Sequence, residues 1–78
     1  MAKKSPLFAG NSQLVSIGRR IRELRKEKGL SQEALAEAAS IDRSYLGGIE
    51  RGEHNLNIMM LIGIAKTLNV GICDLFKD

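Results

Sequence analysis

Apolar residues in the first third of the chain recur at helical spacing. Leu14, Ile17, Ile21 and Leu24 follow one another in steps of three and four residues, so they share one face of a helix. Gly29 then supplies a residue type that commonly ends helices. The pattern predicts a helix that begins near Leu14, ends at Gly29 and turns its apolar face toward a core.

Four further helices are predicted downstream. Ser31, Asp42 and Asn57 have side chains suited to capping helix N-termini, and Gly52 is suited to ending the third helix. No segment alternates with the period of two that is typical of strands. The sequence therefore predicts an all-α, five-helix domain, whose last four helices span residues 32–39, 43–51, 58–68 and 72–77.

The helix predicted at residues 58–68 is apolar on more than one face. Its core-facing stripe is predicted to be Ile58, Leu61, Ile62, Ala65 and Leu68. A helix that is apolar on several faces must be covered on several faces. We therefore expect a second copy of the chain to cover the remainder, in a homodimer with a two-fold axis. The predicted dimer interface consists of Met59, Met60, Ile64, Ile72 and Phe76.

Size and composition limit the possible functions. A chain of 78 residues is one domain and lacks room for a two-lobed enzyme with a deep cleft. Its one cysteine, Cys73, excludes an intramolecular disulfide and a zinc site built on cysteine pairs. We expect Cys73 to be a small buried side chain beside inward-facing Leu75 and Phe76. With one histidine and no cluster of metal ligands, no catalytic residues, metal or cofactor are expected.

The chain is expected to act in the cytoplasm. No run of about 18 apolar residues is present to span a membrane, and the first residues are too polar for a secretory signal. Residues 1–11, which include Lys3 and Lys4, are expected to form a flexible basic arm ahead of a folded domain at residues 12–78.

Basic residues are concentrated in the first half of the chain. Residues 1–39 carry eight Lys and Arg against four Glu, whereas residues 40–78 carry four against five acidic residues. This asymmetry suggests one side that faces a polyanion such as nucleic acid. The alternative is a charged helix face that is simply solvated. A membrane-surface role would need an exposed apolar face, and the apolar face of the first helix is needed for the core.

The two short helices at residues 32–51 are joined by about three residues, which is the arrangement of a helix-turn-helix. In the second of them, adjacent Gly47 and Gly48 cost about 1.5–2 kcal/mol relative to alanines. We therefore predict an exposed, slim face that a DNA major groove approaches closely. Arg43, at the start of that helix, can offer a bidentate fork to guanine O6 and N7.

The run SQEALAEAASIDRSYLGGIERG resembles the helix-turn-helix of the Cro and phage-repressor (Xre-type) family of DNA-binding regulators. The segments IRELRKEKGLSQEALA and IERG are also typical of this family, and the resemblance covers residues 17–76. It implies a five-helix, lambda-repressor-like fold. The run IDRSYLGGIERGEHNLNI is most similar to the controller proteins of restriction–modification systems, which implies a homodimer on a palindromic double-stranded DNA operator.

The resemblance also implies roles for individual residues. Arg25 and Glu50 match a buried, structural ion pair. The residues predicted to contact bases are Arg43, Ser44 and Tyr45 from the resemblance, and Gly47 and Gly48 from the expected close approach. The residues predicted to contact phosphates are Gln32, Arg51, His54 and Asn55 from the resemblance, and Ser31 and Asn57 from their places at helix N-termini. His54 stands where controllers often carry a second basic residue.

Several alternatives stay open at this point. Tyr45 is as compatible with the core as with the DNA surface, and a lone histidine such as His54 is commonly solvated. The chain is also compatible with a generic Xre-type repressor, or with an antitoxin whose main partner is a protein. Contact with RNA polymerase would need a surface such as the acidic side chains of Glu33 and Glu37.

Overall fold

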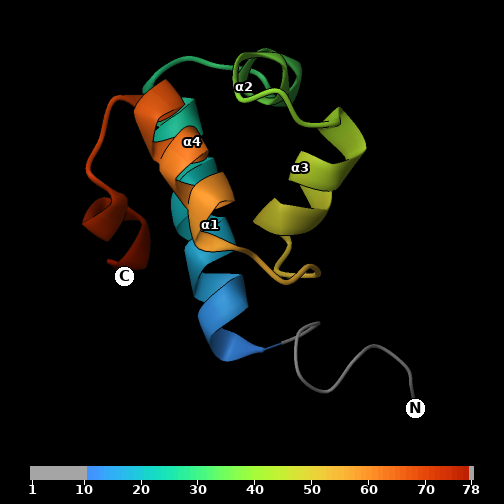
Figure 1. Ribbon diagram of the computed structural model, residues 1–78, viewed down its shortest axis with the longest axis vertical. Coiled ribbons are helices and arrows are strands. Elements are labelled where there is room, and N and C mark those ends of the chain that lie inside the picture. The colour runs from blue at the N-terminus through green and yellow to red at the C-terminus, as the bar shows by residue number, and fades with distance from the viewer. Residues whose placement is uncertain (1–10, 78) are drawn as a thin grey trace.

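A computed structural model describes residues 11–77 of the chain and shows an all-helical fold in that range. Four α-helices are followed by one short 3-10 helix, η1 (Figure 1). The all-α prediction is confirmed, but the fifth helix is a 3-10 turn. The elements are α1 (Ser12–Glu27), α2 (Gln32–Ala38), α3 (Arg43–Glu50), α4 (Ile58–Leu68) and η1 (Ile72–Phe76).

Local capping signals set the ends of α1. The side chain of Asn11 accepts hydrogen bonds from the backbone N–H groups of Gln13 and Leu14, at 2.9 and 3.3 Å. The helix therefore begins at Ser12, two residues before the start near Leu14 that its apolar stripe predicts. Gly29 lies just past the helix end with a φ of 73°, a conformation that favours glycine. The predicted basic arm lies outside the described residues, apart from Asn11.

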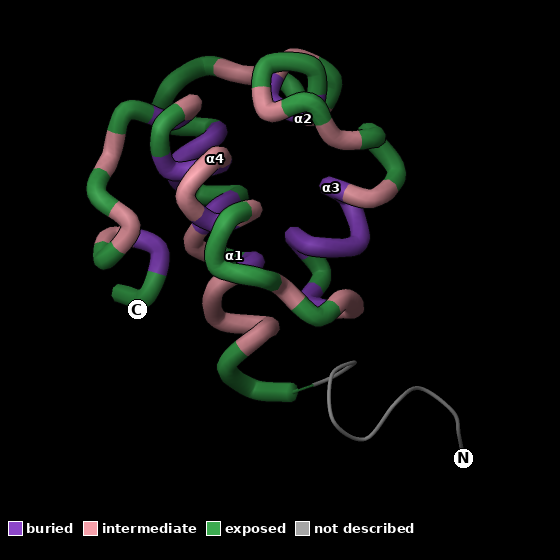
Figure 2. The backbone as a smooth tube through the Cα atoms, in the orientation of Figure 1, coloured by how far each residue is buried: buried purple, intermediate pink, exposed green. Residues whose placement is uncertain are grey.

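The core forms where the helices face one another. α1 packs against α3 and η1, while α4 packs against α2 and η1, and the buried stretches lie on the inward sides of the helices (Figure 2). The core side chains are Ile21, Leu24, Leu35, Ala36, Leu46, Ile49, Leu61, Ile64, Ala65, Leu68 and Leu75. No helix among residues 11–77 is long and apolar enough to cross a membrane.

The orientation predicted for α4 is wrong at Ile64 and Ile58. Ile64 is fully buried, so it is not available to a dimer interface, whereas Ile58 is 57% exposed and Ile62 is half-buried. The buried stripe runs through Leu61, Ile64, Ala65 and Leu68. Because nearly every position of α4 is apolar, the sequence alone does not show which side of the helix faces the core.

The predictions for the last segment are also partly wrong. Leu75 is fully buried as predicted, but Cys73 and Phe76 are exposed. A 3-10 helix has three residues per turn, so side chains three apart lie on one side. Ile72 and Leu75 therefore share the side that packs against the core, and Cys73 and Phe76 point elsewhere.

Candidate nucleic-acid interface

Helices α2 and α3 form a helix-turn-helix whose N-termini are both capped by side chains. Ser31 Oγ accepts from the backbone N–H of Ala34 at 3.0 Å, and Asp42 Oδ2 accepts from that of Ser44 at 3.2 Å. Between the helices, Ser40 adopts a φ of 60°. This turn sets α3 at an angle to α2 (Figure 1) and leaves Arg43 exposed at the first position of α3.

The Asp42 carboxylate also receives a hydrogen bond from the hydroxyl of Ser44. This hydroxyl, followed by backbone N–H groups of Ser44 and Tyr45, lowers the pKa of Asp42 below its ordinary value. A carboxylate with a lowered folded-state pKa stabilises the fold above its unfolded pKa, and this contribution is lost as the pH falls through the folded pKa. Capping of α3 therefore persists at neutral pH. Ser44 lies exposed beside Arg43.

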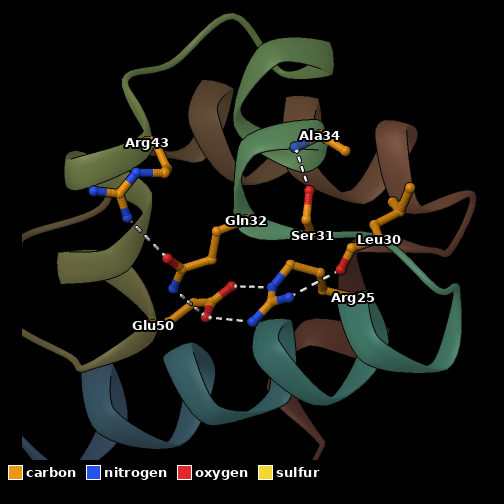
Figure 3. A network of polar contacts seen from close by, with 7 residues as sticks. All are labelled: Arg25, Leu30, Ser31, Gln32, Ala34, Arg43 and Glu50. Carbon is orange, nitrogen blue, oxygen red and sulfur yellow. Dashed lines mark hydrogen bonds and ion pairs between the residues drawn. The ribbon is translucent and has the colours of Figure 1, made fainter.

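A buried ion pair between Arg25 of α1 and Glu50 of α3 joins the two helices. Arg25 Nε donates to Glu50 Oε2 at 2.7 Å, and Arg25 Nη2 donates to Glu50 Oε1 at 3.1 Å (Figure 3). Both residues are 8% exposed. A third guanidinium nitrogen, Nη1, donates to the carbonyl of Leu30 at 2.9 Å. The predicted structural pair is present, and it fastens α3 to the body of the domain.

Gln32 connects this ion pair to the surface. Its side-chain amide donates from Nε2 to Glu50 Oε1 at 3.0 Å and accepts at Oε1 from Arg43 Nη1 at 3.3 Å. Figure 3 shows the amide between the carboxylate and the exposed guanidinium. The structure therefore places Gln32 and Arg43, from two different helices, in one polar network.

The prediction of an exposed glycine face is wrong. Gly47 and Gly48 are buried, because neighbouring side chains cover them. A Cβ at position 48 would overlap the imidazole of His54, and a Cβ at position 47 would lie 3.2 Å from Arg51 Nη1. The two glycines therefore make room for side chains of the domain itself, and the structure gives them no surface for a base.

His54 is held against α3 by two contacts. Its ring covers Gly48 and stacks on Tyr45, with ring centroids 4.6 Å apart and planes inclined by 30°. Tyr45 is half-buried and packs against the core cluster. The core alternative for Tyr45 is therefore met in part, and its contact with DNA stays a prediction. His54 is not a freely solvated side chain.

The remaining predicted phosphate contacts differ in their surroundings. Arg51 is exposed and pairs with Glu53, Nε to Oε2 at 2.9 Å and Nη2 to Oε1 at 3.2 Å. Glu53 raises the pKa of Arg51 through these bonds. Asn55 is exposed, and Asn57 caps α4 by accepting from the backbone N–H of Met60 at 2.8 Å. The pair with Glu53 uses two of the five donors of the Arg51 guanidinium.

Three functional features were missed by reasoning from the sequence. Glu53 as the partner of Arg51 could have been found from their spacing, because the two charges lie two residues apart in a loop. The stacking of His54 on Tyr45 and the bridging amide of Gln32 join residues from different elements, and no local pattern signals them. Within residues 11–77 no cluster of three His, Cys, Asp or Glu side chains is placed to hold a metal ion.

Comparison with known proteins gives consistent matches. Residues 21–75 match the helix-turn-helix family. The control protein C.MunI of a Mycoplasma species is 36% identical over 69 residues, which cover 87% of this chain and 93% of that protein. The crystal structure of the restriction–modification controller protein C.AhdI from Aeromonas hydrophila matches with a TM-score of 0.79 and 48% identity, covering 81% of this chain and 96% of that one. The structure of the biofilm regulator SinR in complex with DNA matches with a TM-score of 0.74 and 42% identity, over 78% and 98% of the two chains.

Proposed function

The chain belongs to the helix-turn-helix family of DNA-binding transcriptional regulators, which are not enzymes, and we propose that it is the controller protein of a restriction–modification system. In this proposal it binds a palindromic operator in the cytoplasm as a homodimer. The similarity to the controller proteins C.MunI and C.AhdI over most of both chains supports this assignment.

The exposed start of α3 is the observation that carries the DNA-reading role. Arg43 is solvent-exposed at the first position of a capped recognition helix, with Ser44 beside it. Recognition helices of this motif contact base edges with their N-terminal residues, and an arginine there offers two parallel donors to guanine. We propose that Arg43, Ser44 and the outer edge of Tyr45 lie against bases.

Phosphate contacts are proposed around this helix. The exposed side chains of Arg51, Asn55 and Ser31 border the helix-turn-helix, and His54 and Asn57 lie on the loop between α3 and α4. Such contacts fix the register of a protein on the duplex without reading its sequence. Glu33 and Glu37 are exposed on α2, and we propose them as a surface for RNA polymerase.

The proposed function is tested by letting the protein select duplexes from a pool of random sequence. We expect enrichment of one palindromic sequence, because a dimer presents two copies of α3 to half-sites about one helical turn apart. Binding to the selected duplex should weaken by roughly 10³-fold or more between about 50 and 200 mM salt if each dimer neutralises six or more phosphates. A pool that emerges without enrichment, or enrichment without a two-fold repeat, contradicts the proposal.

Dimerisation is proposed because one small module buries too little surface for tight specific binding. Exposed apolar side chains are available on two elements that pack against each other, α4 and η1. Met59 is 71% exposed and Phe76 is 52% exposed, while Met60 and Ile72 are half-buried. Ile58, which is 57% exposed, replaces the buried Ile64 in the proposed interface.

Charge at this surface is expected to produce monomers. Met59→Asp and Phe76→Asp each place a carboxylate where an apolar partner surface would lie, which costs free energy only in the dimer. Analytical ultracentrifugation should show wild-type dimers and variant monomers, and the variants should bind the selected duplex far more weakly. Lys26→Asp, at an exposed position of α1, is the control and should remain dimeric. Unchanged sedimentation of both apolar-site variants would place the interface elsewhere.

A further inference from the structure

The 3-10 helix η1 presents an exposed apolar side chain but has little regular structure of its own to hold it. It spans five residues, and 3-10 helices have poorer hydrogen-bond geometry than α-helices. Leu75 is fully buried and packs η1 against the core, whereas the next residue, Phe76, is 52% exposed. The place that Phe76 takes on the surface therefore depends on the contacts between η1 and the rest of the domain.

Arg20 of α1 makes a polar contact with the backbone of η1. Its Nε donates to the carbonyl oxygen of Asp74 at 3.0 Å, across 54 positions of the sequence and in partly buried surroundings. Nη1 of the same guanidinium lies 3.5 Å from Glu23 Oε1, one turn further along α1. Because the acceptor is a backbone oxygen, the bond holds η1 itself against α1, where the two elements pack together (Figure 1).

The side chain of Asp74 fastens both ends of η1. Oδ2 accepts from the backbone N–H of Gly71 at 3.0 Å, just before the helix, and Oδ1 pairs with Lys77 Nζ at 2.9 Å, just after it. The hydrogen bond from Lys77, followed by that from Gly71, lowers the pKa of Asp74, so the carboxylate is charged at neutral pH. Asp74 therefore ties η1 together and, through its carbonyl, joins it to Arg20.

We propose that Arg20 is a positioning residue for the dimer surface, which holds η1 against α1 so that Phe76 faces a second copy of the chain. This inference rests on the proposed homodimer and deepens it. A chain whose η1 has come away from α1 cannot present this surface, so only the docked fraction of chains dimerises. Because a dimer needs two docked chains, its dissociation constant rises as the inverse square of that fraction.

This role separates Arg20 from the other basic residues of α1. Arg19 and Arg22 are exposed, whereas only 23% of the Arg20 side chain is exposed. Its guanidinium is engaged by η1 and by Glu23. The concentration of positive charge in the first half of the chain therefore includes one arginine that the inference assigns to assembly and not to DNA contact.

The test compares two substitutions of Arg20 that remove the same charge and differ in one donor. In Arg20→Gln the amide nitrogen lies as many bonds from the backbone as Nε of arginine, so a donor is retained, whereas Arg20→Met has none. Arg19→Met is the matched control, because Arg19 is exposed and, within residues 11–77, makes no hydrogen bond to η1. Sedimentation over a dilution series gives the dimer dissociation constant, and thermal melting verifies folding.

Arg20→Met should raise the dimer dissociation constant about tenfold, which corresponds to a docked fraction of roughly one third. Arg20→Gln and Arg19→Met should remain close to the wild type. Amide hydrogen exchange reports on η1 directly. The N–H of Asp74, bonded to the Gly71 carbonyl at 2.9 Å, should exchange faster in Arg20→Met, while the N–H of Leu46 in α3 should not. Asp74→Ala loosens η1 independently and should also weaken the dimer, even if Arg20→Met fails to fold.

Three results would overturn the inference. The first is a dimer dissociation constant that changes less than about twofold in both Arg20→Met and Asp74→Ala. The second is equal weakening by Arg20→Gln and Arg20→Met, which would exclude the hydrogen bond as the cause. The third is weaker DNA binding by Arg20→Met with unchanged dimerisation, which would make Arg20 a DNA contact. A wild type that stays monomeric at every concentration overturns the proposed homodimer as well, whereas the first three results leave the homodimer standing.

Discussion

Replacing Glu50 with alanine is expected to lower the free energy of unfolding by about 3–5 kcal/mol, because it leaves the buried guanidinium of Arg25 without a counter-charge. Arg25 is 8% exposed and directs two of its nitrogens at Glu50. A domain of this size has a total stability of roughly 4–12 kcal/mol. Urea unfolding followed by far-UV circular dichroism should therefore show a much lower midpoint or no folded baseline.

Two control variants test whether the loss of stability in Glu50→Ala comes from the burial of the ion pair. Glu53→Ala removes the carboxylate from the exposed pair with Arg51, and the change should be far smaller because solvent and salt screen such pairs. The double variant Arg25→Met/Glu50→Leu should recover most of the lost stability, because apolar side chains of similar volume replace buried ion pairs at little cost. Equal midpoints for Glu50→Ala and Glu53→Ala would contradict the stabilising role of the buried pair.

Helix boundaries could be predicted from the sequence because their causes are local. Ser31, Asp42 and Asn57 each accept a hydrogen bond from a backbone N–H two or three residues ahead, so the capping residue and the capped group lie in one short segment. Gly29 and Gly52 adopt positive φ values of 73° and 76° at the ends of α1 and α3. Neither contact nor conformation depends on the rest of the fold.

The side of α4 that faces the core could not be predicted, because packing against other helices determines it. The helix has apolar side chains around most of its circumference, so its own sequence permits several core stripes. Packing against α2 and η1 selects the one that contains Ile64. Similarly, the glycine pair of α3 predicted an exposed face, but Gly48 is covered by His54 from the following loop.

In the candidate site, too, some features could be predicted from the sequence and others depend on packing between helices. The exposure of Arg43 followed from its place at the start of a helix, and the Arg25–Glu50 pair followed from family resemblance. The bridge through Gln32 joins residues 18 and 11 positions apart, so no local sequence pattern signals it. The packing of α2 against α3 brings the three side chains within hydrogen-bonding distance, so this network required the structure.

Gly18→Ala is expected to cost about 3 kcal/mol of unfolding free energy, at the upper end of typical overpacking penalties. Gly18 is buried where α1 crosses the end of α3, and an added Cβ would lie 2.8 Å from the backbone oxygen of Glu50 and closer still to that of Ile49. These atoms belong to the backbone and cannot rotate away, so the helices would have to separate. The separation would also stretch the Arg25–Glu50 pair that spans them.

Gly63→Ala is the matched control, because Gly63 also lies within a helix but has open space where its Cβ would be. Alanine there should raise stability by about 0.5–1 kcal/mol through its better helix propensity. Thermal melts at several protein concentrations should thus move in opposite directions for the two variants. If Gly18→Ala melts at the wild-type temperature, the close crossing of α1 and α3 is wrong, and with it the frame that aligns Glu50, Gln32 and Arg43.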